Sequence, residues 1–163
     1  MFWVIVIAIV VIFFIAKGGN LFKSKEEVEA EKKEREKQEE QLMQKMGSSE
    51  LTKSLQLFLL DKFGDLNGEE VIKLRQLAAG GGRAGYIMHV ESNGIIFDLV
   101  NRKGESMDKW AISFDALGYE NLPYGSADIL KKILLKTLGD IPHLMVLDTG
   151  FFMYEQNRPK KSW

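Results

Sequence analysis

The first residues of the chain, MFWVIVIAIVVIFFIA, are apolar without interruption and are followed by Lys17. As a helix this run is about 24 Å long, somewhat short of the roughly 30 Å hydrocarbon layer of a bilayer. Lys17 can extend its ammonium group to the interface, and Trp3, Phe13 and Phe14 provide anchoring aromatic surface. A cleaved signal peptide needs a positive start and a small-residue cleavage site, which this run lacks. The sequence therefore predicts a transmembrane anchor at residues 1–19.

The distribution of Lys and Arg predicts how this anchor is oriented. No basic residue precedes the apolar run, whereas Lys17, Lys23 and Lys25 follow it closely. Positive charge stays on the cytoplasmic side of a membrane. We therefore expect a single-pass membrane protein with its N-terminus outside and its C-terminal domain in the cytoplasm.

Residues 20–46 are rich in Glu and Lys. Between Phe22 and Leu42 the only apolar residues are Val28 and Ala30, so a coiled-coil seam is absent. Strong helix formers with opposite charges four residues apart predict a solvated helix, a stiff spacer of roughly 40 Å. A disordered charged linker is the alternative.

Overall composition excludes several classes of function. The chain has 22 Lys and Arg against 23 Asp and Glu, without the basic excess of a nucleic-acid binder. It has no cysteine, which excludes disulfides, thiolate metal sites and cysteine nucleophiles. Two histidines provide few of the ligands that a zinc site needs. We expect neither a metal nor a cofactor, and no nucleic-acid partner.

Residues 47–163 are predicted to form one globular domain whose first element is a helix. Ser48 or Ser49 can cap a helix that ends near Phe63. Its apolar face includes Leu51, Leu55, Phe58 and Leu59. Leu57 and Leu60 widen that face, which predicts that the helix is well buried.

Two further helices are predicted in this domain. Asn67 followed by Glu70 is typical of a capping box and predicts a helix that ends near Ala79, before three glycines. Ser126 is the expected cap of a helix that ends at Leu138.

Three consecutive strands are predicted between these helices. GYIMHVESNGIIFDLVN has Asn93-Gly94 between two β-rich runs, which predicts a type I′ turn. DKWAISF alternates apolar and polar residues and supplies the third strand. HLMVLDTGFFMYEQ is apolar on both faces and predicts two more strands, central in the sheet or covered on both sides. The order of elements predicts an α+β fold: two helices, a three-stranded meander, a helix and a C-terminal β-hairpin, with a mostly antiparallel sheet.

Asp148-Thr149-Gly150, flanked by apolar runs, resembles the active-site triplet of aspartic proteases. That chemistry needs two such carboxylates sharing a proton, and the chain has one copy. Phe151 also occupies a position that is small in those proteases. Asp and Gly at these positions favour a turn instead, so we interpret the triplet as the corner of the last hairpin.

The predicted first hairpin carries the candidate catalytic residues. If Asn93-Gly94 is a two-residue turn, His89 lies opposite Asp98 with Glu91 on the same face. A His–Asp dyad can orient an imidazole as a general base. A structural cross-strand ion pair is the alternative, because the sequence identifies no nucleophile.

The same face of this hairpin carries the candidate partner-binding residues. They combine apolar and polar side chains: Ile87, His89, Glu91, Ile96 and Val100. Because the other face already supplies a core, either the domain's own helices or a partner should cover this one.

These features favour a membrane-anchored cytoplasmic module that binds other protein subunits, an accessory or scaffold subunit rather than an enzyme. The alternative is a small membrane-tethered hydrolase or ligand-sensing regulator that uses His89 and Asp98.

Overall fold

A computed structural model describes residues 24–79 and 83–155 of the chain. The predicted anchor, residues 1–19 with Trp3, Phe13, Phe14 and Lys17, lies outside these residues. Within the described ranges no helix combines the length and apolar character needed to cross a bilayer. The chain divides into two compact units, with the boundary between Glu40 and Gln41.

Helix α2 (Lys25–Gly47) confirms the helical prediction for the charged segment where that segment is described. Its start is a capping box that the sequence analysis missed. The Ser24 hydroxyl accepts the Glu27 N–H (3.2 Å), and the Glu27 carboxylate accepts the Ser24 N–H (3.0 Å). None of its residues is buried, as expected for a helix without an apolar stripe.

Helix α3 (Glu50–Phe63) begins after Ser49, whose hydroxyl accepts the Thr52 N–H (3.2 Å). This cap and the predicted end of the helix are confirmed. The prediction that Leu57 and Leu60 widen the buried face is wrong, because their exposed fractions are 67% and 46%. They lie on the side of α3 that turns away from its buried residues.

The other two helices begin differently from the sequence predictions. Helix α4 (Glu69–Ala79) starts from Gly68, whose carbonyl accepts the Ile72 N–H, and Glu70 points into the core instead of closing a capping box. Helix α5 (Ser126–Gly139) follows Gly125, which has a φ of 79°. Ser126 is therefore a buried first-turn residue and not the cap.

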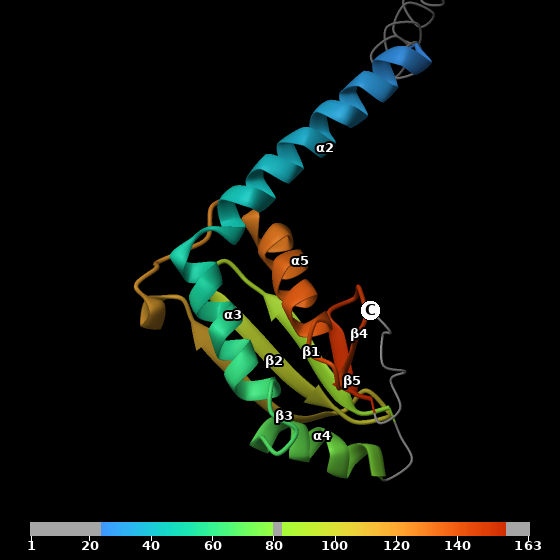
Figure 1. Cartoon of the computed structure of the whole chain (residues 1–163), viewed down its shortest axis with the longest axis vertical. Helices are drawn as coiled ribbons and strands as arrows, with labels where there is room; N and C mark the ends of the chain where they lie inside the picture. The colour runs from blue at the N-terminus through green and yellow to red at the C-terminus, as the bar shows by residue number, and fades with distance from the viewer. Residues whose placement is uncertain (1–23, 80–82, 156–163) are drawn as a thin grey trace, which may run out of the picture. The chain divides into compact units, whose positions relative to one another are not determined.

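The strands form one five-stranded antiparallel sheet in the order β3-β2-β1-β5-β4. Their bounds are β1 Gly85–Val90, β2 Gly94–Val100, β3 Ser106–Ser113, β4 Leu144–Val146 and β5 Phe151–Tyr154. The meander, the later helix and the C-terminal hairpin are confirmed, and with them the α+β class (Figure 1). The prediction of two central strands holds only for β5, because β4 lies at the sheet edge.

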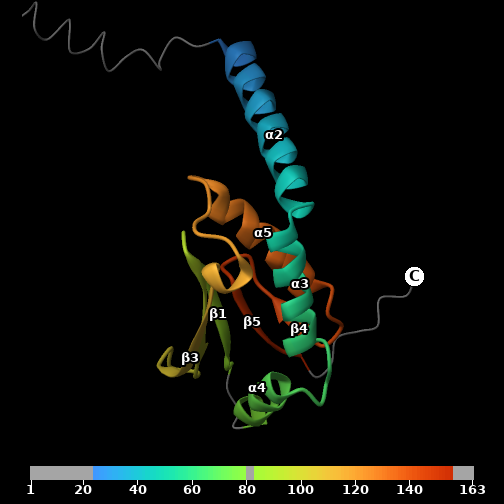
Figure 2. The ribbon, with the colours of Figure 1, turned by 90° about the vertical axis from the view of Figure 1, so that its left-hand side faces the viewer.

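The core lies between one face of the sheet and helices α3, α4 and α5. Alternate strand residues supply it, including Tyr86, Met88, Phe97 and Phe152, each with an exposed fraction of 0%. In Figure 2, strands β1 and β3 lie to one side and α3 to the other, with α4 below. We call the face of the sheet that carries Tyr86 and Phe97 the covered face. The domain therefore has two layers, helices on sheet.

The turn between β4 and β5 contains Asp148-Thr149-Gly150. The Gly150 N–H bonds to the Leu147 carbonyl (2.9 Å), which closes the turn, and Gly150 has a φ of 92°. The Gly150 carbonyl accepts the Met88 N–H (2.9 Å), which ties the hairpin to β1. The interpretation of this triplet as a hairpin corner is confirmed.

Replacing Gly150 should destabilise the fold. A Cβ there would lie 2.8 Å from the Lys131 Cε and 2.9 Å from the Met88 carbonyl oxygen, at a φ that L-residues rarely adopt. We expect Gly150→Ala to lower the free energy of unfolding by about 1–3 kcal/mol, measured by urea unfolding of the detergent-solubilised chain. Asp148→Asn, at an exposed position of the same turn, should change it by less than about 0.5 kcal/mol. Equal effects of the two changes would contradict this account.

Candidate protein-interaction face

The second face of the sheet is not packed against any of the described helices, and we call it the open face. Its residues alternate with those of the covered face along each strand. On β1 and β2 it carries Ile87, His89, Ile96, Asp98 and Val100, of which Val100 is buried, and Glu91 follows β1 directly in the turn. Strands β4 and β5 add Met145, Phe151 and Met153, and β3 adds Lys109, Ala111 and Ser113.

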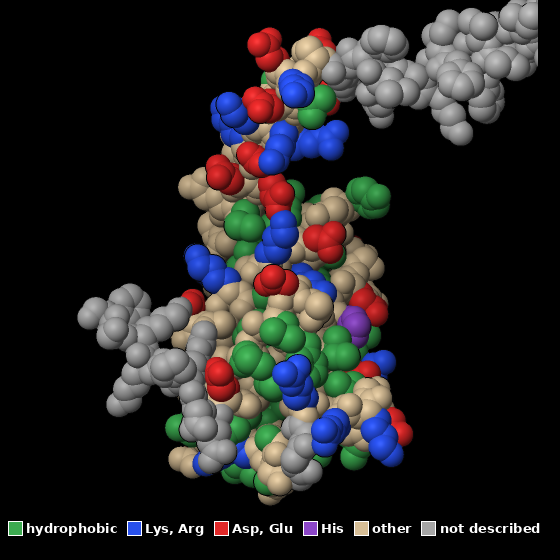
Figure 3. Space-filling model, turned by 90° about the vertical axis from the view of Figure 1, so that its right-hand side faces the viewer, with side chains coloured by type: hydrophobic (Ala, Val, Ile, Leu, Met, Phe, Trp, Pro, Cys, Tyr) green, Lys and Arg blue, Asp and Glu red, His purple; other side chains and the backbone are tan. Residues whose placement is uncertain are grey.

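The open face has an apolar centre with polar groups around it. Ile87, Ile96 and Phe151 are half-buried, although the core cluster lies on the other side of the sheet. His89 and Glu91 are exposed. Figure 3 faces the side where β4 and β5 lie in Figure 1, and shows hydrophobic side chains in the middle with charged ones around them. Apolar surface rimmed by polar residues is typical of a protein-binding site.

The sequence analysis missed the contribution of the last hairpin to this face. The signal was present in the apolar residues on both sides of residues 144–154. Alternate positions, Met145, Phe151 and Met153, belong to the open face, whereas Leu144 and Phe152 belong to the core. The segment is apolar on both sides because it contributes to both faces, and not because helices cover both.

The predicted pairing of His89 with Asp98 is wrong. His89 lies opposite Ile96, and Asp98 lies opposite Ile87. His89 and Asp98 are thus diagonal neighbours, about 7–8 Å apart at their backbones by strand geometry. The Asp98 carboxylate instead accepts a hydrogen bond from the Ser106 hydroxyl on β3. The two candidate residues share the open face, but they do not form the predicted dyad.

The register differs because the turn lies one residue earlier than Asn93-Gly94. Ser92 and Asn93 form its centre, and the Glu91 N–H bonds to the Gly94 carbonyl (2.8 Å). Gly94 belongs to β2, where a Cβ would lie 2.4 Å from the Ile112 carbonyl oxygen. The glycine therefore permits close strand approach and does not supply the positive φ of a type I′ turn.

A polar cluster lies at the covered face, where α4 meets the sheet. The buried Tyr86 hydroxyl donates to the buried Glu70 carboxylate. The Lys73 ammonium lies 3.3 Å from Glu70, 3.5 Å from Glu69 and 3.6 Å from Asp108 on β3. Partial burial lowers the pKa of Lys73, but the hydrogen bond and charge of Glu70 and the other two carboxylates raise it above 10.5 overall. This cluster joins α4 to β1 and β3.

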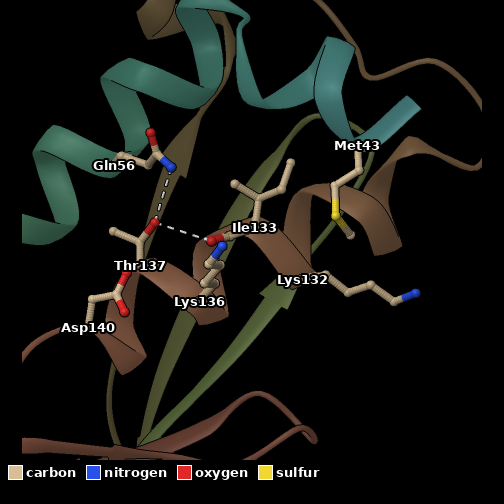
Figure 4. Close-up of a pocket in the computed structure, with 7 residues that line it drawn as sticks. All are labelled: Met43, Gln56, Lys132, Ile133, Lys136, Thr137 and Asp140. Carbon is tan, nitrogen blue, oxygen red and sulfur yellow. Dashed lines mark hydrogen bonds between the residues drawn. The ribbon is translucent and has the colours of Figure 1, made fainter. Parts of the chain in front are cut away.

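A shallow groove of about 290 Å³ lies beside α3 and α5. Its lining residues are Met43, Gln56, Lys132, Ile133, Lys136, Thr137 and Asp140 (Figure 4). The Gln56 amide donates to the Thr137 hydroxyl (3.2 Å), which donates to the Ile133 carbonyl (3.2 Å). These bonds tie α3 to α5, so we assign the groove to helix packing.

Neither the groove nor the open face contains an assembled catalytic set. Among residues 24–79 and 83–155, no group of three His, Asp or Glu side chains is arranged to hold a metal ion. The second histidine, His143, is buried and its Nε2 donates to the Phe63 carbonyl at the end of α3 (2.7 Å). It therefore has a structural role.

Comparisons with models of protein families, with curated proteins and with solved structures found no match to this chain.

The Lys73 cluster predicts a pH-dependent contribution to stability. The pKa of Lys73 is raised in the folded state. Its ion pairs therefore stabilise the folded state fully below the unfolded-state pKa of about 10.4, and this stabilisation is lost as the pH rises through the folded-state pKa. Lys73→Met should cost about 0.5–1 kcal/mol at pH 7, measured by urea unfolding, and the difference from wild type should shrink above about pH 10.5.

Lys53→Met is the matched control, because Lys53 is an exposed helical lysine to which the structure gives no ion pair within the described residues. It should leave the free energy of unfolding unchanged to within about 0.5 kcal/mol at both pH values. A pH-independent effect of Lys73→Met would show that its ion pairs are not the cause.

Proposed function

We propose that this chain is a single-pass, membrane-anchored protein-interaction module, an accessory or scaffold subunit whose open face binds another protein. The apolar centre of that face is the observation that carries the proposal. Ile87, Ile96 and Phe151 meet there across three adjacent strands, and no described helix packs on them. A partner that covers them would remove this apolar surface from water.

The rim of the open face supports a protein as the partner. Glu91 and Asp98 carry negative charge, Lys109 carries positive charge, and His89 can donate or accept a hydrogen bond. An apolar centre inside a mixed polar rim is the usual anatomy of a protein–protein interface. A phosphate backbone would instead require a dominant positive charge.

The anchor and the charged segment supply the rest of the proposal. The apolar run at residues 1–16 supports a membrane anchor, and the lysines that follow it support a cytoplasmic domain. Helix α2 lacks both a buried residue and an a/d seam, which suits a spacer.

A charge at the centre of the open face should abolish partner binding. We expect Ile96→Arg to reduce the partner retained by the tagged, gently solubilised chain at least about tenfold, or about 1.4 kcal/mol, because burying an unpaired charge is unfavourable. Quantitative mass spectrometry of the retained proteins measures this.

The matched control is Leu57→Arg, which places the same charge at an exposed apolar position on α3, in the helical layer. It should retain the partner as wild type does. Equal retention by the Ile96→Arg chain, or a wild-type chain without a stoichiometric partner after crosslinking, would refute the proposal.

The orientation is tested with an engineered cysteine, since the chain has none of its own. A Lys53→Cys chain should resist a membrane-impermeant maleimide in intact cells and react after permeabilisation. Reaction in intact cells would place the domain outside the cytoplasm.

The alternative, a membrane-tethered hydrolase or ligand-sensing regulator, depends on His89 and Asp98. Their diagonal placement and the bond from Ser106 to Asp98 give it no specific support. An intact phenotype of a folded His89→Ala chain would argue against it.

A further inference from the structure

Strand β3 forms the long free edge of the sheet. Its eight residues, Ser106–Ser113, pair on one side only, with β2. The opposite edge strand, β4, has three residues. Edge strands are usually kept short or interrupted by proline, because their unpaired backbone groups attract another strand. Strand β3 is long and contains no proline, and its protection is limited to Asp108, Lys109 and a register shift against β2 near its start.

The pairing register shows which backbone groups point outward. The Phe114 N–H bonds to the Asn93 carbonyl (2.9 Å), and hydrogen-bonded pairs recur at every second residue in an antiparallel ladder. Trp110 and Ile112 therefore bond to β2, and the N–H and C=O groups of Lys109 and Ala111 face away from the sheet. Within the described residues no hydrogen bond occupies these outward groups.

We propose that two copies of this chain associate through β3, antiparallel and with Ala111 opposite Ala111 of the second copy. The two-fold axis runs perpendicular to the sheet, which makes the contact isologous and the combined sheet ten-stranded. The proposal goes beyond the proposed function, because it needs no other protein.

The side chains select this register. On the covered face, Trp110 of each copy lies opposite Ile112 of the other, so the contact contains two such pairs. Pairs of an aromatic and a β-branched side chain stabilise sheets. Both side chains are half-buried in one chain, so the second strand completes their burial. On the open face, Lys109 lies opposite Ser113.

The neighbouring registers are less favourable. Centring the contact on Lys109 places two ammonium groups directly opposite each other, which destabilises a strand pair. Centring it on Trp110 places the Asp108 carboxylate opposite Ile112. Centring it on Ile112 shortens the ladder, because β3 ends at Ser113.

The absence of native cysteine allows a direct test on the full chain in detergent. Ala111→Cys should form an intermolecular disulfide under mild oxidation, because its Cα atoms lie about 5.5 Å apart in the proposed pair. When Lys109→Cys chains are mixed with Ser113→Cys chains, the disulfide should form between the two kinds of chain, because residues 109 and 113 lie opposite each other in the proposed pair. Two copies of the same variant should crosslink less, because their cysteine Cα atoms are about 13 Å apart along the strands. Non-reducing electrophoresis with one chain tagged measures both.

Lys53→Cys on α3 is the control for chance collision within micelles. We expect Ala111→Cys to crosslink at least about tenfold faster than this control. A rate equal to the control, or no preference in the Lys109→Cys and Ser113→Cys mixture, would overturn the proposal.

A second measurement does not depend on cysteine. Ala111 is exposed in one chain, so Ala111→Arg leaves the fold intact but places like charges opposite each other across the contact. We expect this chain to be monomeric by light scattering corrected for detergent. Mixing it with Ala111→Glu chains should restore a dimer. Dimers of Ala111→Arg alone, or no dimer in the mixture, would overturn the proposal.

Discussion

The packing of Tyr86 against the helices is the interaction on which the rest of the structure depends. Its ring stacks on Phe152 (5.6 Å between centroids) and meets Phe63 edge to face (5.6 Å), which joins two strands to the end of α3. Its hydroxyl donates to Glu70, which joins the same point to α4. A buried carboxylate needs such partners, so this hydrogen bond favours the observed position of α4 against the sheet.

Because helices α3, α4 and α5 pack on the face that carries Tyr86, none of the described helices covers the other face, although Val100 and Met153 on it are buried. A sheet covered on one side normally has polar residues on the other. The open face departs from this pattern at Ile87, Ile96 and Phe151 while keeping it at its rim. This departure within an otherwise consistent fold is where function is expected, since sequences violate local rules mainly at functional sites.

The sequence predicted what depends on local pattern. Strand alternation assigned each residue of the first hairpin to its correct face, because a register error of two residues leaves the faces unchanged. Hydrophobic periodicity and the Ser49 cap located α3. These predictions agree with the structure because residues close in sequence determine the features concerned.

The sequence could not predict what tertiary contacts decide. The sequence around Gly94 predicted a turn residue, but Gly94 approaches Ile112 closely and belongs to β2. The spacing of Glu70 from Asn67 predicted a capping box, but Glu70 is buried and accepts a hydrogen bond from Tyr86. In each case the residue type suits two environments, and only the position of a distant strand selects one of them.

The open face and the free edge of β3 are compatible because they use different groups of the same sheet. Partner binding to the open face engages side chains such as Ile87 and Ile96, whereas edge pairing engages the backbone of Lys109 and Ala111. The two-fold axis perpendicular to the sheet would keep both open faces on the same side. A dimer would therefore present two adjacent copies of the apolar centre, and a partner with two binding segments would be held more tightly than by one chain alone.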